Sequence, residues 1–396
     1  MILARYLFVL FFFAGIPFSS STSSREGVKY KKKAVRVLKK EAVARADSNL
    51  RLPPLTITAI PCRRSRGGLH DFYSEGDYWW PDPDHPEGPY IRRDGLSNPH
   101  NFNGHRQALI RFSIITGNLT TAWLITGKKK YALAVLPHLR AWFITDSTRM
   151  NPGLQYAQAI KGRYSGRSIG IIDGIHLMEV AQSVRVLEKD HLIPADDLRK
   201  IKQWFSDLTH WLTTSGFGRT EMMHPNNHST CWNIQTAVYA RLTGDEQVLE
   251  LCRDNYRSRL LPGQMAEDGS FPRELKRTKP YGYSLFNLDA MVMNCLVLSD
   301  STHDLWSYET PGGKSILKAI AWMAPYVKDK SAWPLPPDVM YWEQWPVAQP
   351  AFLFGAIRFN KKEWFSIWAK HRHFLQNSEV IRNMPVRNPV IWFEYL

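Results

Sequence analysis

The segment QALIRFSIITGNLTTAWLITGKKKYALAVLPHLRAWF, residues 107–143, decides the fold. Its apolar residues recur at the spacing of amphipathic helices on both sides of Thr126-Gly127. A glycine at such a point typically ends one helix and lets the chain turn. The pattern therefore predicts two paired helices, over 107–126 and 130–143.

Similar pairs of apolar, helix-spaced segments follow along the chain. They predict helices over 173–187 and 195–215, 232–242 and 246–260, 283–299 and 315–327, and 350–359 and 362–374. Before them, residues 26–49 predict a basic amphipathic helix whose apolar positions are Val28, Val35, Leu38 and Val43. Helical pairs of similar size without strand alternation favour an all-α fold in which the pairs stack in a ring or solenoid.

Three connections are long, polar and rich in glycine or proline: 52–103, 151–170 and 265–283. We expect them to be ordered loops, because long loops on a helical scaffold commonly carry functional sites. The first contains the aromatic run DYWWPDP, whose rings either stack on sugars or only pin the loop to the body of the protein. Nothing in composition marks a second domain.

The overall charge points to an acidic partner. The chain has 51 Lys and Arg against 36 Asp and Glu, a formal net charge of +15. A field of this sign attracts nucleic acid, anionic lipid or acidic polysaccharide. No zinc-ligand pattern, RNA-binding signature or basic zipper accompanies it, so we expect no nucleic acid as partner.

The amino terminus predicts export. Residues 1–24 combine a positive charge, an apolar run and a Ser/Thr-rich stretch, as in a secretory signal peptide, which leaves 25–396 as the mature domain. No other apolar run approaches the length of a membrane span, so we expect a secreted monomer without a membrane partner. The sequon Asn118-Leu-Thr120 predicts a glycoprotein. The chain has four cysteines, Cys62, Cys231, Cys252 and Cys295, which allow three disulfide connectivities that spacing alone does not resolve.

Two polar stretches carry the chemistry: MMHPNNHSTCW, residues 222–232, and ELKRTKPYGY, residues 274–283. Amides and an arginine bind a carboxylate, and an imidazole and a phenol move protons. We expect the two stretches to meet across one cleft and to catalyse elimination in a uronic-acid sugar. Asn227, His228 and Arg277 would neutralise the sugar carboxylate while Tyr283 transfers the proton, provided that positive charge lowers the pKa of Tyr283.

Each of these residues also has a structural interpretation. Asn226-Asn227 is a suitable helix cap, His228 a structural hydrogen-bonding group, Arg277 part of a solvated turn, and Tyr283 a core residue. Two other functions compete with elimination. A glycoside hydrolase would need two facing carboxylates, for which the sequence offers Asp77, Asp82, Asp94 and Asp268. A secreted polyanion-binding protein would need only the positive charge and the aromatic loop.

The motifs together resemble those of the alginate-lyase-domain polysaccharide lyases, most closely families five and thirty-eight. PNNHS at 225–229, ELKR at 274–277 and YSLFNL at 283–288 carry the resemblance. DYWWPDP at 77–83, PYIRRDG at 89–95, TRMNPGLQYAQAIKG at 148–162 and IID at 171–173 extend it.

The resemblance implies an incomplete (α/α) toroid in a single catalytic domain and a β-elimination that uses no metal ion and no cofactor. It places the catalytic roles on Asn227, His228, Arg277 and Tyr283, with Arg273 and Tyr281 as alternatives to the last two. The implied substrate is glucuronan or mannuronate-rich alginate. The residues expected to bind that substrate are His70, Tyr78, Trp79, Trp80, Arg92, Arg93, Gln155, Tyr156, Gln158, Asn226, Arg273 and Tyr281.

Overall fold

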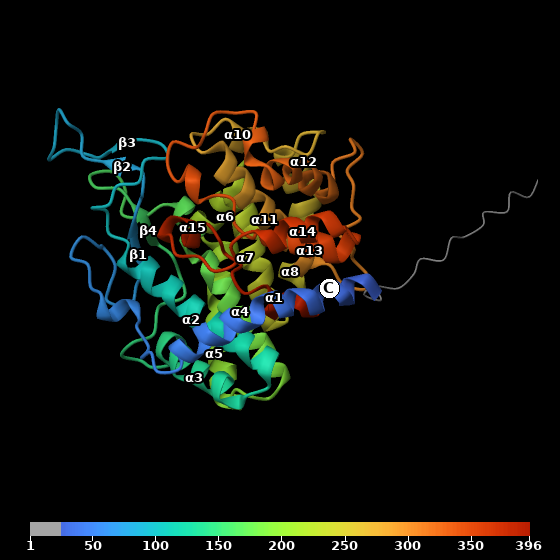
Figure 1. Cartoon of the computed structure of the whole chain (residues 1–396). Coiled ribbons are helices and arrows are strands. Elements are labelled where there is room, and N and C mark those ends of the chain that lie inside the picture. The colour runs from blue at the N-terminus through green and yellow to red at the C-terminus, as the bar shows by residue number, and fades with distance from the viewer. Residues whose placement is uncertain (1–24) are drawn as a thin grey trace, which may run out of the picture.

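The computed structural model describes residues 25–396, in which helices are joined by long loops (Figure 1). The predicted signal peptide, 1–24, lies outside the described residues. The helices are α1 Arg25–Asn49, α2 Gly104–Thr126, α3 Lys129–Phe143, α4 Leu177–Lys189, α5 Ala195–Thr214, α6 Gly216–Met222, α7 Asn227–Thr243, α8 Glu246–Asn255, α9 Leu261–Gln264, α10 Pro272–Leu275, α11 Pro280–Leu298, α12 Ile316–Lys328, α13 Pro350–Phe359, α14 Lys362–Lys370 and α15 Ser378–Arg382. The strands are β1 Tyr73–Glu75, β2 Trp79–Trp80, β3 Ile91–Arg92 and β4 Tyr156–Ala159.

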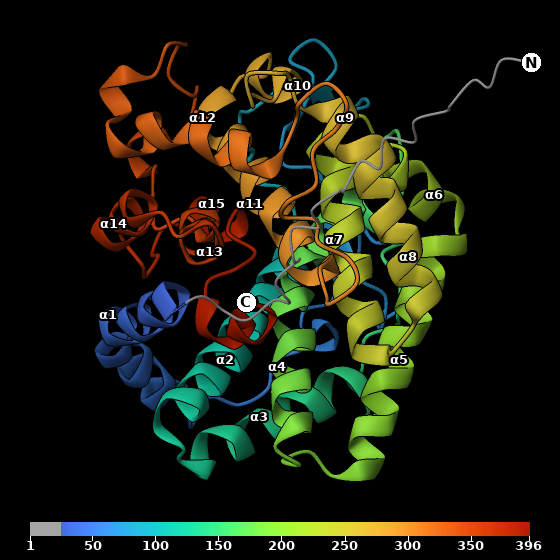
Figure 2. The same ribbon diagram turned by 90° about the vertical axis from the view of Figure 1, so that its right-hand side faces the viewer.

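The helices form two layers around a ring. Inner helices α2, α4, α7, α11 and α13 each pack against the next in that order, and α1 contacts both α13 and α2. Figure 2 shows α1 lying between these two ends of the series. Helices α3, α8, α12 and α14 each pack outside the inner helix that precedes them, and α5 packs against α7 and α3. The expected all-α fold, an (α/α) toroid in a single domain, is confirmed.

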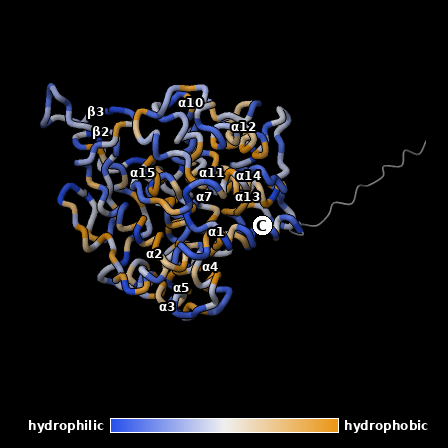
Figure 3. Tube along the Cα trace, viewed as in Figure 1, coloured by the Kyte–Doolittle hydropathy of each residue, from blue (hydrophilic) through white to orange (hydrophobic). Residues whose placement is uncertain are grey.

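The inner helices α7 and α11 are buried on all sides, which is typical of helices at the centre of a large protein. Every residue of α11 is buried except Tyr283. In α7 the residues that escape burial are His228, Arg241 and Thr243. In Figure 3 hydrophobic residues concentrate along the helices, whereas the loop between β2 and β3 is largely hydrophilic. The core thus fixes α7 and α11 in place. Near its amino-terminal end α7 presents His228, and α11 presents Tyr283.

Helix α1 is amphipathic as predicted, but its buried row differs from the predicted one. The buried residues are Gly27, Tyr30, Ala34, Leu38, Ala42 and Ala46. Val28 is exposed, and of the predicted apolar positions only Leu38 is buried. The small alanines on this face let α1 approach α2 closely. The buried face is therefore the one that allows close helix packing, and not the one with the larger apolar side chains. Lys31 of this helix donates hydrogen bonds to the backbone oxygens of Phe393 and Leu396, near the end of the chain.

Helix α2 bears on two expectations from the sequence, the lack of a further membrane span and the glycosylation of Asn118. It is long and apolar enough to cross a membrane by composition, but 67% of its most apolar window is buried inside the protein, as in a core helix. The Asn118 side chain is also buried and its Nδ2 donates to Asn49 Oδ1 at 2.9 Å. The sequon at Asn118 is therefore buried in the folded protein, and glycosylation there stays a prediction.

The loops contain four short strands that the sequence did not predict. β1 pairs with β4 in parallel, with Tyr73 opposite Tyr156, and β2 pairs with β3 antiparallel, with Trp79 opposite Arg92. Strands of two to four residues are too short to show alternation. The pairing ties the predicted loops 52–103 and 151–170 together. All four cysteines are free, and Cys231, Cys252 and Cys295 are buried.

Helix boundaries differ from prediction mainly at polar ends. Helix α7 begins at Asn227 and not at 232, because a polar first turn has no apolar periodicity. The helix predicted over 173–187 begins at Leu177, after a 3₁₀ segment Ser168–His176. The helix predicted over 246–260 changes to a π-helical turn at Tyr256–Leu260.

Candidate active site

A cleft of about 370 Å³ lies where the amino-terminal ends of α7 and α11 face the loop that carries β1, β2 and β3. Helix amino termini carry partial positive charge, so two of them at one cleft favour an anionic ligand. The lining residues are Asp77, Tyr78, Trp79, Arg92, Gln158, Arg167, Ile169, Ile172, His224, Asn226, Asn227, His228, Arg277, Tyr283, Phe286, Arg382 and Asn383.

A larger hollow, of about 460 Å³, lies against α3 and α5. Its lining includes neither histidine nor tyrosine, and four of its polar side chains form two pairs. Arg149 pairs with Asp146 at 3.2 Å, and Gln203 donates to Asp207 at 2.8 Å. Because it lacks the imidazole and the phenol that the predicted elimination requires, we place the candidate active site in the smaller cleft.

The first turn of α7 positions two asparagines. Asn226 is the N-cap, and its Oδ1 accepts a hydrogen bond from the backbone N–H of His228 at 3.2 Å. The carboxylate of Glu274 accepts from the backbone N–H of Asn227 at 2.8 Å and from its Nδ2 at 2.7 Å. Burial raises the pKa of Glu274, and the bonds from Asn227 oppose that rise. The asparagine amide is thereby fixed, and among residues 25–396 nothing bonds its carbonyl oxygen or its second N–H.

His228 is oriented by a buried carboxylate. Its Nδ1 lies 2.7 Å from Oε1 of Glu221, a residue that is 0% exposed. Since Nδ1 donates to Glu221, Nε2 is the nitrogen left for the cleft. The ring of His224 lies beside it, with the two centroids 4.9 Å apart. Burial, together with the charge of His228, lowers the pKa of His224.

Arg277 and Tyr283 form a second group across the cleft. The Arg277 guanidinium lies 4.5 Å from the centroid of the Tyr283 ring, with Nη2 3.5 Å from its hydroxyl. The same guanidinium donates to both carboxylate oxygens of Asp94, at 3.2 and 3.0 Å. Burial acts to raise the pKa of Asp94, but Arg277 and Arg92 outweigh it and hold the pKa at about 2.

The electrostatic environment of Tyr283 differs from the expectation. The sequence argument required positive charge to lower its pKa, whereas burial raises the pKa well above the ordinary value of 10.0. Neighbouring Tyr78 adds to the rise, and Arg277 opposes it without cancelling it. The ligand-free cleft therefore holds Tyr283 as a neutral phenol, since desolvation disfavours the phenolate more than one arginine favours it.

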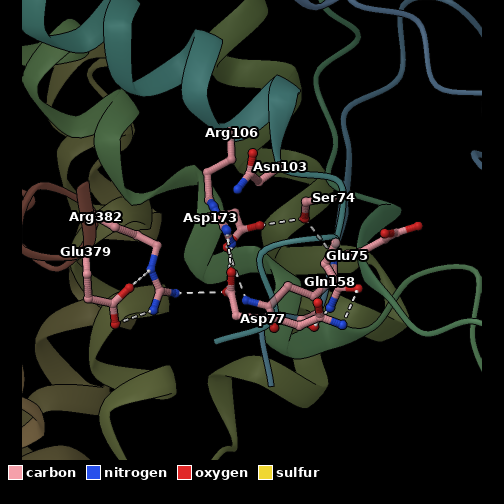
Figure 4. A network of polar contacts seen from close by, with 12 residues as sticks. Ser74, Glu75, Asp77, Asn103, Arg106, Gln158, Asp173, Glu379 and Arg382 are labelled. Carbon is pink, nitrogen blue, oxygen red and sulfur yellow. Dashed lines mark hydrogen bonds and ion pairs between the residues drawn. The ribbon is translucent and has the colours of Figure 1, made fainter. Parts of the chain in front are cut away.

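Beneath the cleft, a network of ion pairs joins the first loop to the end of the chain (Figure 4). Arg106 of α2 and Arg382 of α15 both donate to Asp77 Oδ2, at 2.9 and 3.0 Å. Arg382 also pairs with Glu379 at 2.8 Å, and Arg106 reaches Asp173 at 3.4 Å. Burial would raise the pKa of Asp77, but the two arginines outweigh it and lower the pKa. The network holds Asp77, and with it the neighbouring Tyr78 and Trp79, in a fixed position.

The four residues assigned catalytic roles, Asn227, His228, Arg277 and Tyr283, all line the same cleft. Of the residues expected to bind substrate, the lining includes Tyr78, Trp79, Arg92, Gln158 and Asn226. It does not include His70, Trp80, Arg93, Gln155, Tyr156, Arg273 and Tyr281.

Three of these excluded side chains have clear structural partners. Tyr281 is 0% exposed and its hydroxyl donates to Tyr326 O at 3.0 Å, so it is out of reach of a sugar in the cleft. Trp80 donates to Leu96 O at 2.9 Å, and the Arg93 guanidinium lies 5.5 Å from its ring centroid. For this pair the contacts lie within the loop itself, whereas the alternative interpretation of the DYWWPDP run had the rings pin the loop to the body of the protein.

Sequence reasoning did not identify His224, Arg167, Arg382 and Asn383 as cleft residues. His224 lies within the quoted stretch 222–232, so the signal was present there. Arg382 lies 305 positions from its partner Asp77, and no local pattern connects them.

Across residues 25–396, no cluster of three or more His, Cys, Asp or Glu side chains is arranged to hold a metal ion. The positive groups of the cleft are instead arginines and the helix ends. The site can therefore bind a carboxylate, hold an amide and an imidazole against it, and move a proton through a phenol.

The family model and the solved structures that resemble this chain are those of alginate lyases. The family model described as "Alginate lyase" matches residues 57–333. An alginate lyase structure from Bacteroides ovatus is 28% identical, with a TM-score of 0.78 over 93% of this chain and 100% of that chain. Alginate lyase A1-III from Sphingomonas species A1 is 16% identical, with a TM-score of 0.50 over 82% and 89% of the two chains. A variant of A1-III in complex with a tetrasaccharide gives a TM-score of 0.55 at 16% identity, over 89% of this chain and 93% of that chain. No curated protein matches the sequence.

Proposed function

Because the chain belongs to the alginate lyase family, we propose that it cleaves a β-1,4-linked uronate polymer by β-elimination without a metal ion. Family membership makes the protein a polysaccharide lyase. The proposal adds the polymer, glucuronan or mannuronate-rich alginate, and the roles of the residues. The observation that carries it is the presence of Asn227, His228, Arg277 and Tyr283 in the lining of one cleft.

Elimination requires that the sugar carboxylate be neutralised. Removing the proton from C5, next to the carboxylate, creates an enolate-like dianion, and donors fixed where that charge develops lower the barrier most. In our proposal the Asn227 amide, His228 Nε2 and the Arg277 guanidinium bind this carboxylate. Glu274 and Glu221 hold the first two in place before substrate arrives, which supports this role.

Tyr283 transfers the proton. As a phenolate it takes the proton from C5, the electron pair forms the C4–C5 double bond, and the C4–O bond breaks. The resulting phenol then protonates the departing glycosidic oxygen and returns to phenolate. One residue serves both steps because in β-D-glucuronate and β-D-mannuronate the C5 proton and the C4 oxygen lie on the same face. The raised pKa of Tyr283 makes the phenolate a strong base, at the cost of a small ionised population at neutral pH.

The carboxylates of the cleft do not support a glycoside hydrolase. Such an enzyme needs one carboxylic acid that is protonated near neutral pH. Asp77 and Asp94 line or border the cleft, but arginines lower the pKa of both. Asp82 and Asp268 are absent from the lining.

The test is ultraviolet absorbance with polymannuronate, polyguluronate, glucuronan and hyaluronan offered separately, with and without chelator. A rise on one polymer that survives chelation supports metal-independent elimination and identifies the sugar. A flat trace on all four with binding retained would reject the proposal in favour of a polyanion-binding protein. Release of reducing ends without absorbance would indicate a hydrolase.

We also propose that the protein is secreted as a monomer after removal of residues 1–24. The positive charge at Arg5 followed by an apolar run supports a signal peptide. Amino-terminal sequencing of protein recovered from culture medium tests the cleavage, and light scattering tests the monomer.

A further inference from the structure

The arginines around the cleft differ in their ion pairs. Arg92 and Arg277 pair with Asp94, and Arg382 pairs with Asp77 and Glu379. Arg167 lies in the same lining, yet within residues 25–396 no carboxylate oxygen comes within ion-pair distance of it. A desolvated cation without a direct ion pair is costly, and a ligand carboxylate in the cleft would supply that pair.

Arg167 is nevertheless held firmly. Its Nε donates to the backbone oxygen of Gln158 at 2.8 Å, and its Nη2 donates to Gln158 Oε1 at 3.2 Å. The guanidinium lies 5.6 Å from the centroid of the Trp79 ring. A guanidinium has five N–H donors, so these two bonds leave capacity for a further acceptor.

A glycine next to Arg167 leaves space for its guanidinium and for the Trp79 ring. A Cβ at Gly76 would come within 2.9 Å of Arg167 Nη2 and 2.8 Å of Trp79 Cδ1, so only glycine lets both side chains lie here. Gln158, the anchor of Arg167, takes a positive φ of 50°, which is strained for a residue with a side chain. Burial lowers the pKa of Arg167 to about 10, with Asp173 opposing the fall and Arg92 adding to it, so it is still a cation at neutral pH.

We propose that Arg167 is a second carboxylate-binding residue, which receives the uronate next to the one that reacts at Tyr283. Arg277 already binds Asp94 and lies on the Tyr283 ring, so it serves the reacting sugar. Arg167 lies against the ring of Trp79, which lines the same cleft. A planar guanidinium binds a carboxylate through two parallel bonds, which adds geometric selectivity.

This inference rests on the proposed function and makes it more specific. The preferred ligand is a chain with a carboxylate on consecutive sugars. A polymer in which a neutral sugar alternates with the uronate leaves Arg167 unpaired, which is the costly state. Alternating polymers such as hyaluronan should therefore bind more weakly than homopolymers of uronate.

The experiment measures binding by calorimetry in the Tyr283→Phe background, so that turnover does not interfere. The probes are a homouronate tetrasaccharide and the same oligosaccharide with its carboxylates reduced to alcohols. Arg167→Met should weaken binding of the charged probe about 10- to 100-fold, as expected for loss of a charge-assisted hydrogen bond. It should leave binding of the reduced probe unchanged within about threefold, because the interaction it removes is with the carboxylate.

The matched control is Arg163→Met. Arg163 lies over the same Trp79 ring at 5.6 Å but is exposed and absent from the cleft lining. Equal affinities of the Arg163 and Arg167 variants for the charged probe would overturn the proposal. Equal losses on both probes would also overturn it, because they would indicate that Arg167 only supports Gln158.

A third variant, Arg167→Lys, keeps the charge and removes the planar fork. We expect it to recover part of the lost affinity for the charged probe, and no recovery would contradict a charge-based role. The Arg167 comparison is decided by binding, whereas the proposed function is decided by absorbance of the unmodified protein. The two can therefore fail independently.

Discussion

The hydroxyl of Tyr283 donates a hydrogen bond to the hydroxyl of Tyr78 at 2.8 Å and so joins the first turn of α11 to the loop between β1 and β2. Lys279 Nζ lies 4.9 Å from the Tyr78 ring centroid and 5.4 Å from that of Tyr283. Tyr283 is also the one residue of α11 that is not buried. The fold thus presents a single phenol from a buried helix to the cleft and gives it a second phenol as hydrogen-bond partner.

Tyr283→Phe should lower kcat by about 10²- to 10⁴-fold, the usual contribution of a positioned acid–base group. Polymer affinity should remain within about threefold, because the ring and its contact with Arg277 persist. Steady-state absorbance kinetics and calorimetry measure the two quantities. The control is Tyr281→Phe, whose lost hydrogen bond to Tyr326 is remote from the cleft and should leave kcat unchanged.

Full activity in Tyr283→Phe would assign the proton transfer elsewhere. Tyr78 and His228 are then the groups to substitute next, since both line the cleft. Tyr281, which the sequence left as an alternative, is fully buried and cannot take over.

The pH dependence of kcat/KM should have an alkaline rise. This parameter reports ionisations of the free enzyme, in which burial holds the pKa of Tyr283 above 10.0. If the phenolate is the base, the active fraction grows as pH increases toward that pKa. A plot of log kcat/KM should therefore climb with a slope near one over the alkaline range where the protein stays folded. A plateau beginning near pH 7 would show that the base is not Tyr283 in this state.

Glu221→Gln should lower kcat about 10- to 100-fold, the equivalent of one charge-assisted hydrogen bond, without changing the lining of the cleft. Glu221 is fully buried, Oε1 binds His228 Nδ1, and Oε2 has no hydrogen-bond partner among the described residues. Among the described residues the carboxylate therefore has one side-chain partner, His228, so the substitution tests its effect on that imidazole.

The control for this change is Glu267→Gln, which removes an exposed carboxylate outside the cleft. Thermal unfolding of both variants separates loss of folding from loss of catalysis. Equal kcat values for the two variants would exclude a role for Glu221 in orienting His228.

The helical fold was predictable because some of its helices end at residues, such as glycine, that mark a helix end in the sequence. Gly127 and Gly244 both adopt positive φ, 67° and 77°, where glycine is favoured, and apolar periodicity marks the helices between such breaks. The start of α7 was missed since its first turn, NHST, is polar. The strands were missed because pairing between β1 and β4 joins segments that no local pattern connects.

The site was predictable only in part, for a related reason. Asn227, His228, Arg277 and Tyr283 lie close together in the sequence, in two stretches with unusual chemistry. Their carboxylate partners were not identified, because Glu221, Glu274 and Asp94 act through contacts that exist only after folding. The condition that positive charge lowers the pKa of Tyr283 is also not met in the ligand-free cleft, because burial raises that pKa and the burial of a side chain does not follow from its sequence neighbours.

Asp94→Asn should strengthen binding of a uronate oligosaccharide several-fold in the Tyr283→Phe background. In the ligand-free cleft, Asp94 occupies two donors of Arg277 and also accepts from Arg92 at 2.7 Å. A substrate carboxylate must compete with it, and a neutral amide competes less well because it carries no charge. Calorimetry measures the change, with Asp82→Asn as the control because Asp82 lies outside the cleft lining. Weaker binding in Asp94→Asn would mean that Asp94 serves mainly to orient Arg277 over Tyr283, and that its carboxylate prepares the cleft for substrate more than it opposes binding.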